Sequence, residues 1–290
     1  MSRVARAIAV VALVLPAVGT AQQCTPIPSL PAVISQSGSY CLGRSHVVAI
    51  GNGANVAAIQ IDANDVTLDC RGNTIDGRLP ENAVSRSSGI SATSRKNIIV
   101  RNCSVRGFRN GVSFTQNQLI AFTNTGLVVE DNRFDGSQVL GIGVSGDNSV
   151  VRRNIVTNIG GSGQQFAGGI ATGHQTDVVD NLIDGVTSSG DYVFGINQAG
   201  ASGSVVSGNH VRNLASAGSA YGIAVYYSEY RTSLEIRDNV ISNLAPGPDS
   251  TAIVCGSNGS HIAIGNLATG YARVIGDYCV DGGGNRGGTD

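Results

Sequence analysis

The stretch LVVEDNRFDGSQVLGIGV at 127–144 decides the fold of this chain. Its apolar residues alternate with polar ones, and a period of two predicts β-strands whose successive side chains point to opposite faces. Asn132 and Gly136 interrupt the alternation and predict turns, because both residue types tolerate backbone conformations that most residues avoid. The stretch is therefore expected to form short strands that point Val129 and Phe134 into one interior.

The same pattern recurs about every 27 residues. It reads LDCRGNTIDG at 68–77, VVRRNIVTN at 150–158, DVVDNLIDG at 177–185, VVSGNHVRN at 205–213 and LEIRDNVISN at 234–243. Its turn position holds Asn73, Cys103, Asn132, Asn154, Asn181, Asn209, Asn239 and Asn266. A second phrase keeps step with it, namely SGIS, NGVS, LGIG, GGIA, FGIN, YGIA and TAIV. A repeat of this length predicts a stack of similar structural units.

Each repeat is too long for a hairpin and too short for a strand–helix–strand unit. Three short strands per repeat, stacked coil on coil, predict an all-β parallel β-helix. About eight coils spaced by about 4.8 Å would give a rod near 40 Å long. We expect the aligned asparagines to form a ladder, in which each amide bonds to the coils above and below.

Charged residues recur at outward positions of neighbouring coils. The expected pairs are Asp76 with Arg106, Asp131 with Arg153, and Asp184 with Arg212. Opposite charges that face each other across strands stabilise a sheet. We therefore interpret these charges as structural rather than catalytic.

The N-terminus has the features of a secretory signal. Arg3 and Arg6 precede the apolar run 8–15, and Ala21 ends a small-residue cleavage site. The expected organisation is a signal peptide at 1–21, an N-terminal cap at 22–57, the β-helix at 58–266, and a C-terminal cap and tail at 267–290. The mature protein is expected to be secreted or periplasmic.

Composition restricts the partners. The formal net charge is −1, with 19 basic and 20 acidic residues, so the chain lacks the basic excess of a nucleic-acid-binding protein. No stretch after the signal is long enough to span a membrane. We expect a monomer that binds polysaccharide.

Six cysteines in an exported chain predict disulfides. Cys24 with Cys41 would close the N-terminal cap, and Cys255 with Cys279 would close the C-terminal end. The remaining two, at positions 70 and 103, are either bonded to each other or kept as two buried free thiols.

The segments ISQSGSYCL at 34–42 and IQIDANDVTLDCRGNTIDG at 59–77, together with the repeats, carry a resemblance to a known family. Over 58–266 the chain resembles the right-handed parallel β-helix proteins of the pectate-lyase-like superfamily, especially the carbohydrate-binding and sugar-hydrolase type. The resemblance implies a right-handed single-stranded parallel β-helix. It also implies that the strand containing the Gly-Ile phrase forms the floor of a sugar cleft, with loops at both its ends as walls.

The expected floor is uncharged. Its outward residues are Ser91, Ser113, Gly143, Ala171, Asn197, Ala224 and Val254. This departs from the calcium-dependent pectate lyases, which need acidic ligands there. It also departs from the polygalacturonase-like hydrolases, which need clustered aspartates. We therefore expect no metal site and no cofactor; calcium would require an acidic cluster that the sequence does not show.

The loops are the remaining source of chemistry. The segment YGIAVYYSEYR at 221–231 concentrates tyrosines beside an arginine. A lyase or epimerase needs a base that removes a proton next to a carboxylate and a group that neutralises that carboxylate. His174 or Tyr230 is the candidate base and Arg231 the candidate neutraliser. The candidate substrate-binding residues are Asp191, Tyr192, Asn197, Tyr226 and Tyr227. The alternative interpretation is a loop whose tyrosines only cover an apolar edge.

Two functions follow. The first is an exported protein that binds or modifies an extracellular, acidic polysaccharide, with lyase or epimerase chemistry if it is an enzyme. The second is a non-catalytic surface or matrix protein, in which the rod is a spacer or an adhesive.

Overall fold

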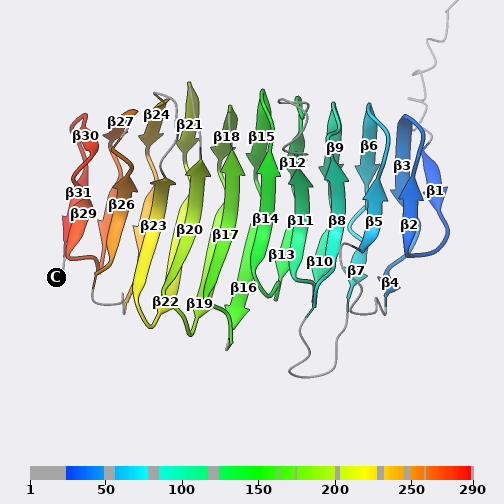
Figure 1. The fold of residues 1–290 in the computed structure, drawn as a ribbon, viewed down its shortest axis with the longest axis horizontal. Coiled ribbons are helices and arrows are strands. Elements are labelled where there is room, and N and C mark those ends of the chain that lie inside the picture. Colours follow the sequence, from blue (N-terminus) through cyan, green and yellow to red (C-terminus); the bar gives the residue numbers. More distant parts are fainter. Residues whose placement is uncertain are drawn as a thin grey trace, which may run out of the picture.

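The computed structural model describes residues 24–48, 56–77, 85–116, 124–161, 163–173, 175–199, 203–226, 232–244, 249–257 and 259–288. The expected signal peptide lies outside these residues. Within them the strands form three parallel sheets of eleven, ten and ten strands, here called sheets A, B and C (Figure 1).

Sheet A consists of β1 (Thr25–Ile27), β3 (Gly38–Leu42), β6 (Val66–Asp69), β9 (Ile98–Arg101), β12 (Val128–Glu130), β15 (Ser149–Arg152), β18 (Thr176–Val179), β21 (Ser204–Ser207), β24 (Thr232–Arg237), β27 (Gly259–Ile264) and β30 (Cys279–Asp281). Sheet B consists of β2 (Ala32–Ile34), β5 (Ala57–Ile61), β8 (Ser88–Thr93), β11 (Asn110–Thr115), β14 (Leu140–Ser145), β17 (Phe166–Gly173), β20 (Tyr192–Ala199), β23 (Ser219–Tyr226), β26 (Thr251–Cys255) and β29 (Arg273–Ile275). Sheet C consists of β4 (His46–Val47), β7 (Thr74–Asp76), β10 (Ser104–Arg106), β13 (Arg133–Asp135), β16 (Ile155–Gly161), β19 (Leu182–Ser188), β22 (His210–Ser216), β25 (Val240–Ser242), β28 (Leu267–Thr269) and β31 (Arg286–Gly288).

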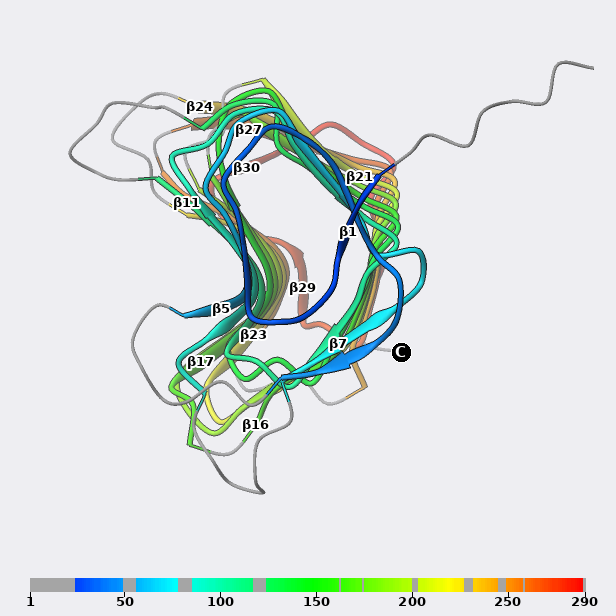
Figure 2. The ribbon, with the colours of Figure 1, turned by 90° about the vertical axis from the view of Figure 1, so that its right-hand side faces the viewer.

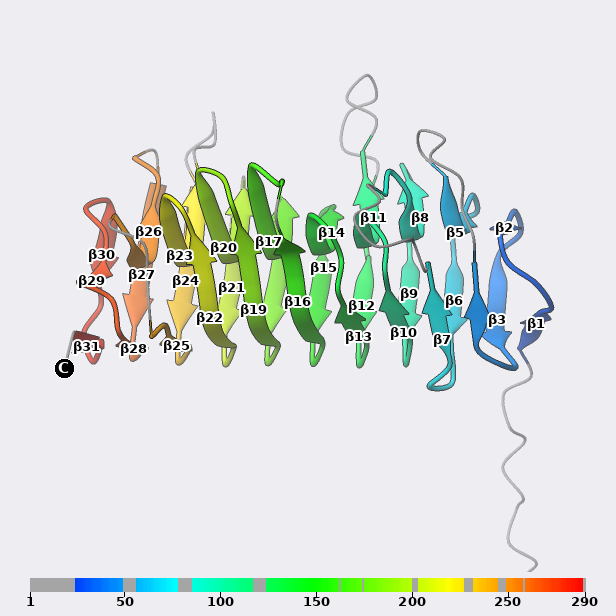
Figure 3. The same ribbon diagram turned by 90° about the horizontal axis from the view of Figure 1, so that it is seen from below.

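The chain passes from sheet B to sheet A to sheet C in each coil, so the predicted parallel β-helix is confirmed. Viewed along the axis, successive coils superimpose (Figure 2). The segments expected as caps also supply strands, β1 to β4 at one end and β28 to β31 at the other, so the stack continues beyond eight coils. Seen from below, β16, β19 and β22 of sheet C lead into β17, β20 and β23, the strands of sheet B that follow them in the chain (Figure 3).

Aliphatic side chains of the same kind stack along the interior. The column in sheet B is formed by Ile59, Ile90, Val112, Ile142, Ile170, Ile196, Ile223 and Ile253, all fully buried. Branched side chains suit this packing because their shape fills the pleated surface. The core is therefore one continuous apolar column rather than a central cluster.

The asparagine ladder is confirmed between sheets A and C. The Asn181 amide donates to the carbonyl oxygen of Val151 at 2.9 Å, and its oxygen accepts from the backbone N–H of Asn154 at 3.0 Å. The same exchange is repeated from Asn132 to Asn266, and it continues to Asn285, which lies beyond the predicted repeat. Each amide thus satisfies backbone groups that the turn would leave unpaired.

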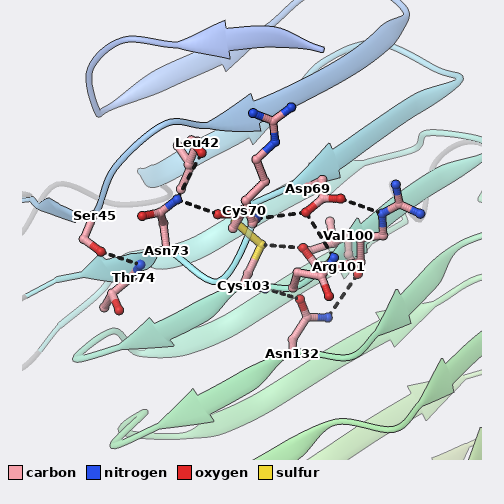
Figure 4. The surroundings of a disulfide bond; sticks show 12 residues. Leu42, Ser45, Asp69, Cys70, Asn73, Thr74, Val100, Arg101, Cys103 and Asn132 are labelled. Atoms are coloured by element: carbon pink, nitrogen blue, oxygen red, sulfur yellow. Dashed lines mark hydrogen bonds and ion pairs between the residues drawn. A yellow bond between two sulfur atoms is a disulfide. The ribbon is translucent and has the colours of Figure 1, made fainter. Parts of the chain in front are cut away.

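All six cysteines form disulfides: Cys24–Cys41, Cys70–Cys103 and Cys255–Cys279. The central bond, left open by the sequence, has a Cα–Cα distance of 4.7 Å (Figure 4). The register pairs Leu68, not Cys70, with Val100, so Cys70 lies past the strand, at the corner. There it is close enough to form a disulfide with Cys103, which occupies the position of the asparagine ladder in the next coil.

The predicted charge pairs are also formed. Arg106 lies 2.7 Å from Asp76, Arg153 lies 2.7 Å from Asp131, and Arg212 lies 2.8 Å from Asp184. Hydrogen bonding from Arg153 holds the pKa of the Asp131 carboxyl below its ordinary value. These pairs explain the charged columns without a catalytic role.

Candidate functional site

The outer face of sheet B is the candidate site. The predicted floor residues are in register across the strands, with Ser113 beside Ser91 and Gly143, and Asn197 beside Ala171 and Ala224. Viewed along the axis, this sheet bends inward, toward the interior of the coil (Figure 2). The floor is lined by small side chains, so an extended ligand can lie close to the backbone.

A glycine bend changes which residues face outward at the start of each floor strand. In β20, Val193 and Ile196 both belong to the buried core although they are three residues apart. Strict alternation would place them on opposite faces, so the chain bends between them, at Gly195. As a result Tyr192 and Phe194 both point outward, before the bend, and Asn197 points outward after it.

These residues form an aromatic patch, which we define as Phe166, Tyr192, Phe194 and Tyr221. The rings of Phe166 and Tyr192 are stacked with centroids 5.8 Å apart, and those of Tyr192 and Phe194 are 6.4 Å apart. Tyr221 is in register with Phe194 on the next strand. Phe194 is buried beneath the patch, and the other three residues are half-buried and supply its partly exposed rings.

Gly168 makes this arrangement possible. It lies one coil from Phe194 in the same column, and a Cβ atom there would overlap the Phe194 ring. Without a side chain at this position the ring can lie flat across the neighbouring coil. Sequence analysis identified Tyr192 but missed Phe166 and Phe194; the aromatic residue directly before the Gly-Ile phrase in YVFGI was the available signal.

The structure brings together part of the predicted binding set. Tyr192 and Asn197 share the outer face of β20 but are five residues apart, roughly 16 Å along an extended strand. Asp191 is exposed and directly precedes Tyr192. The side-chain oxygen of Asn197 is buried and has no hydrogen-bond partner among the described residues.

The predicted catalytic residues His174, Tyr230 and Arg231 lie outside the described residues, as does Tyr227. Tyr226 ends β23, in register with Ala199, and its side chain is likewise outside the description. These assignments remain predictions.

Outside sheet B, the described residues offer no comparable chemistry. A pocket of about 680 Å³ at the corner between sheets A and C contains Asp69 and Asp131, but both are ion-paired with arginines. Within the described ranges, no three His, Cys, Asp or Glu residues are grouped to hold a metal ion. No helix in the described part of the chain has the length and apolar character needed to cross a bilayer.

Comparison with known proteins places this architecture. A family model described as "Right handed beta helix region" matches residues 40–195 and 123–267. No curated protein sequence matches the chain. The solved structure of the periplasmic alginate epimerase AlgG is similar with a TM-score of 0.50 at 11% identity, covering 89% of this chain and 61% of that one.

A second similar structure is the GH136 lacto-N-biosidase from Eubacterium ramulus, with a TM-score of 0.50 at 12% identity. That match covers 93% of this chain and 60% of the biosidase chain. This chain thus spans about three fifths of the length of either structure. At such identities the likeness shows the fold.

Proposed function

This chain belongs to the right-handed β-helix family, and from that premise we propose that it binds an extracellular polysaccharide along the outer face of sheet B. The observation that carries the proposal is the aromatic patch beside a floor of small residues. Sugar rings have apolar faces that stack on aromatic rings, and such contacts also bury apolar area.

The floor complements the patch. The half-buried Asn197 has an amide oxygen without a hydrogen-bond partner among the described residues, and the half-buried Ala171 beside it is small. A polar group with an unmet hydrogen bond beside apolar surface is the usual composition of a carbohydrate or small-molecule site. The three disulfides are consistent with an oxidising compartment, so we place the protein outside the cytosol, secreted or periplasmic.

We keep lyase or epimerase chemistry as part of the proposal, with His174 or Tyr230 as base and Arg231 as neutraliser. All three follow strands of sheet B, namely β17 and β23, which are separated only by β20. The second candidate is a non-catalytic surface or matrix protein. It is favoured by the floor column from Ser91 to Val254, whose described side chains include no acid or base.

The test is binding of the full mature protein to a panel of polysaccharides, with Tyr192→Ala as the variant. Loss of a stacked ring is expected to weaken binding about tenfold. Tyr278→Ala is the matched control, because Tyr278 is 60% exposed and lies outside the aromatic patch. No binding across the panel, or equal binding by Tyr192→Ala, would contradict the proposal. Unsaturated products from polyuronates would add lyase activity to it.

A further inference from the structure

We propose that a second site on sheet B binds the carboxylate of a uronic acid residue. This inference rests on the proposed function and specifies its ligand. We call the site the arginine pocket and define it by Arg86, Arg109, Asn110 and the hydroxyl residues of β8 and β11. It lies toward the N-terminal end of the same outer face that carries the aromatic patch.

The pocket has a volume of about 350 Å³. Its floor is built from residues in register, Ser88 beside Asn110 and Ser91 beside Ser113, and Thr93 lies beside Thr115 at the far end. Hydroxyl groups can both donate and accept, so this floor suits the hydroxyls of a sugar ring. None of the described residues that line the pocket is acidic.

Two arginines enter this pocket from neighbouring coils. The backbone N–H of Arg109 donates to the carbonyl oxygen of Ser87 at 2.9 Å. Because Ser87 directly follows Arg86, the two arginines lie on adjacent coils. Coils in a parallel stack are about 4.8 Å apart. Two guanidinium groups that start so close can both reach one carboxylate.

Neither arginine is neutralised by a described residue. Among the described residues, Arg86 and Arg109 form no ion pair. By contrast, each of three arginines elsewhere faces a carboxylate: Arg106 and Arg212 in sheet C, and Arg153 in the turn between sheets A and C. The Asn110 side-chain oxygen, also buried without a hydrogen-bond partner there, is an acceptor and suits a sugar hydroxyl rather than the carboxylate. Guanidinium groups bind carboxylates through paired, charge-assisted hydrogen bonds, so an anionic group of the ligand is the complement that this pocket lacks.

The arginine pocket and the aromatic patch lie on one line. Asn110, Leu140, Gly168 and Phe194 are in register on successive strands, so the column changes from polar to apolar over three coils, about 14 Å. One polysaccharide chain lying along the rod can therefore place a carboxylate in the arginine pocket and a ring face on the aromatic patch. The ligand class is a uronate-containing polysaccharide.

The experiment compares polygalacturonate with the same polymer after its carboxyl groups have been reduced to alcohols. Wild-type protein is expected to bind polygalacturonate at least tenfold more tightly, and added salt should narrow the difference. Arg86→Gln combined with Arg109→Gln should remove the preference while leaving binding of the reduced polymer unchanged. Arg286→Gln removes an exposed arginine of sheet C outside the pocket; it controls for the loss of a positive charge elsewhere on the surface and should behave as wild type.

The outcomes separate the two proposals. Equal wild-type affinity for both polymers, or a preference that survives in the double variant, overturns the arginine pocket and leaves polysaccharide binding standing. If the wild type binds neither polymer and no member of the wider panel, both proposals are overturned. Unchanged melting temperatures of the variants establish that the effect arises from binding.

Discussion

At the scale of single residues, one buried position per coil decides how the turns are satisfied. Asn154, Asn181 and Asn209 are almost completely buried, and each amide bonds to the coils on both sides. Cys103 stands in this column and replaces the amide with a covalent bond to the preceding coil. Its backbone N–H still donates to the side-chain oxygen of Asn132 at 2.9 Å, so the ladder continues from the next coil onward.

Another single residue makes stability depend on pH. His261 is 2% exposed and points inward, in register with Leu234 and Cys279 of sheet A. Burial lowers the pKa of the His261 imidazole from its ordinary 6.5. Above pH 6.5 the ring is neutral in both the folded and the unfolded chain, so protonation of His261 does not reduce the free energy of unfolding. Below it the unfolded chain takes up a proton that the folded chain does not, and stability is lost as the pH falls toward the lower, folded pKa.

We therefore predict that lowering the pH from 7.5 to 5 reduces the free energy of unfolding less in His261→Leu than in wild type. The difference should reach up to about 1.4 kcal/mol for each pH unit between the two pKa values. Urea unfolding at the two pH values measures it, and His210→Leu, at an exposed position, is the control. An identical loss in wild type and His261→Leu would refute the assignment to this ring.

At the scale of the element, the Gly-Ile phrase is explained by the close approach of neighbouring strands. A Cβ atom on Gly89, Gly111, Gly141, Gly169, Gly195 or Gly222 would lie 2.5 to 2.7 Å from a carbonyl oxygen of the next coil. It would also overlap an inward side chain such as Val211 beside Gly195. Glycine is therefore required for steric reasons at each bend, and the same bend turns the aromatic residues outward.

Gly195→Ala should destabilise the protein by about 1–3 kcal/mol, because the added methyl group overpacks a dense interior. Gly143→Ala is the matched control on β14, a floor strand separated from β20 by β17. Its Cβ would meet its nearest neighbour at 3.6 Å, an ordinary contact, so its stability should stay close to wild type. Chemical denaturation compares the two, and equal midpoints would contradict the explanation.

At the scale of the whole molecule, stability is a sum over neighbouring coils. Each strand pairs only with the strands of the coils beside it, as in other repeat proteins, so the terminal coils have a single neighbour. Disulfides lie at both ends: Cys24–Cys41 links the residue before β1 to β3, and Cys255–Cys279 links the end of β26 to β30. They hold the coils that stacking supports least.

Replacing Cys255 and Cys279 with alanine should speed amide hydrogen exchange in β27 to β31 and leave β15 to β18 unchanged. The bond closes a loop with a sequence separation of 24, for which the expected contribution is about 3 kcal/mol. Replacing Cys24 and Cys41 is the matched control and should affect only β1 to β3. Faster exchange along the whole rod would instead indicate a single cooperative unit.

The sequence by itself determined the architecture, because a period of two and a turn residue at a constant spacing are local signals. It predicted the asparagine ladder, the two terminal disulfides, the charge pairs and the floor strand. The candidate site was determined only in part. Alternation alone places Tyr192 and Asn197 on opposite faces, and only the bend at Gly195 brings both to the outer face of β20.

Only the tertiary structure decided which residues of different coils meet. Leu68 pairs with Val100, but Leu68 is five residues before Asn73 whereas Val100 is three residues before Cys103. These two additional residues shift Cys70 to the corner, where it meets Cys103. Register likewise places Arg109 beside the coil of Arg86, although 23 residues separate them in the sequence. The physical reason is that register depends on hydrogen bonds between coils and on the length of every intervening turn, and no short stretch of sequence contains either.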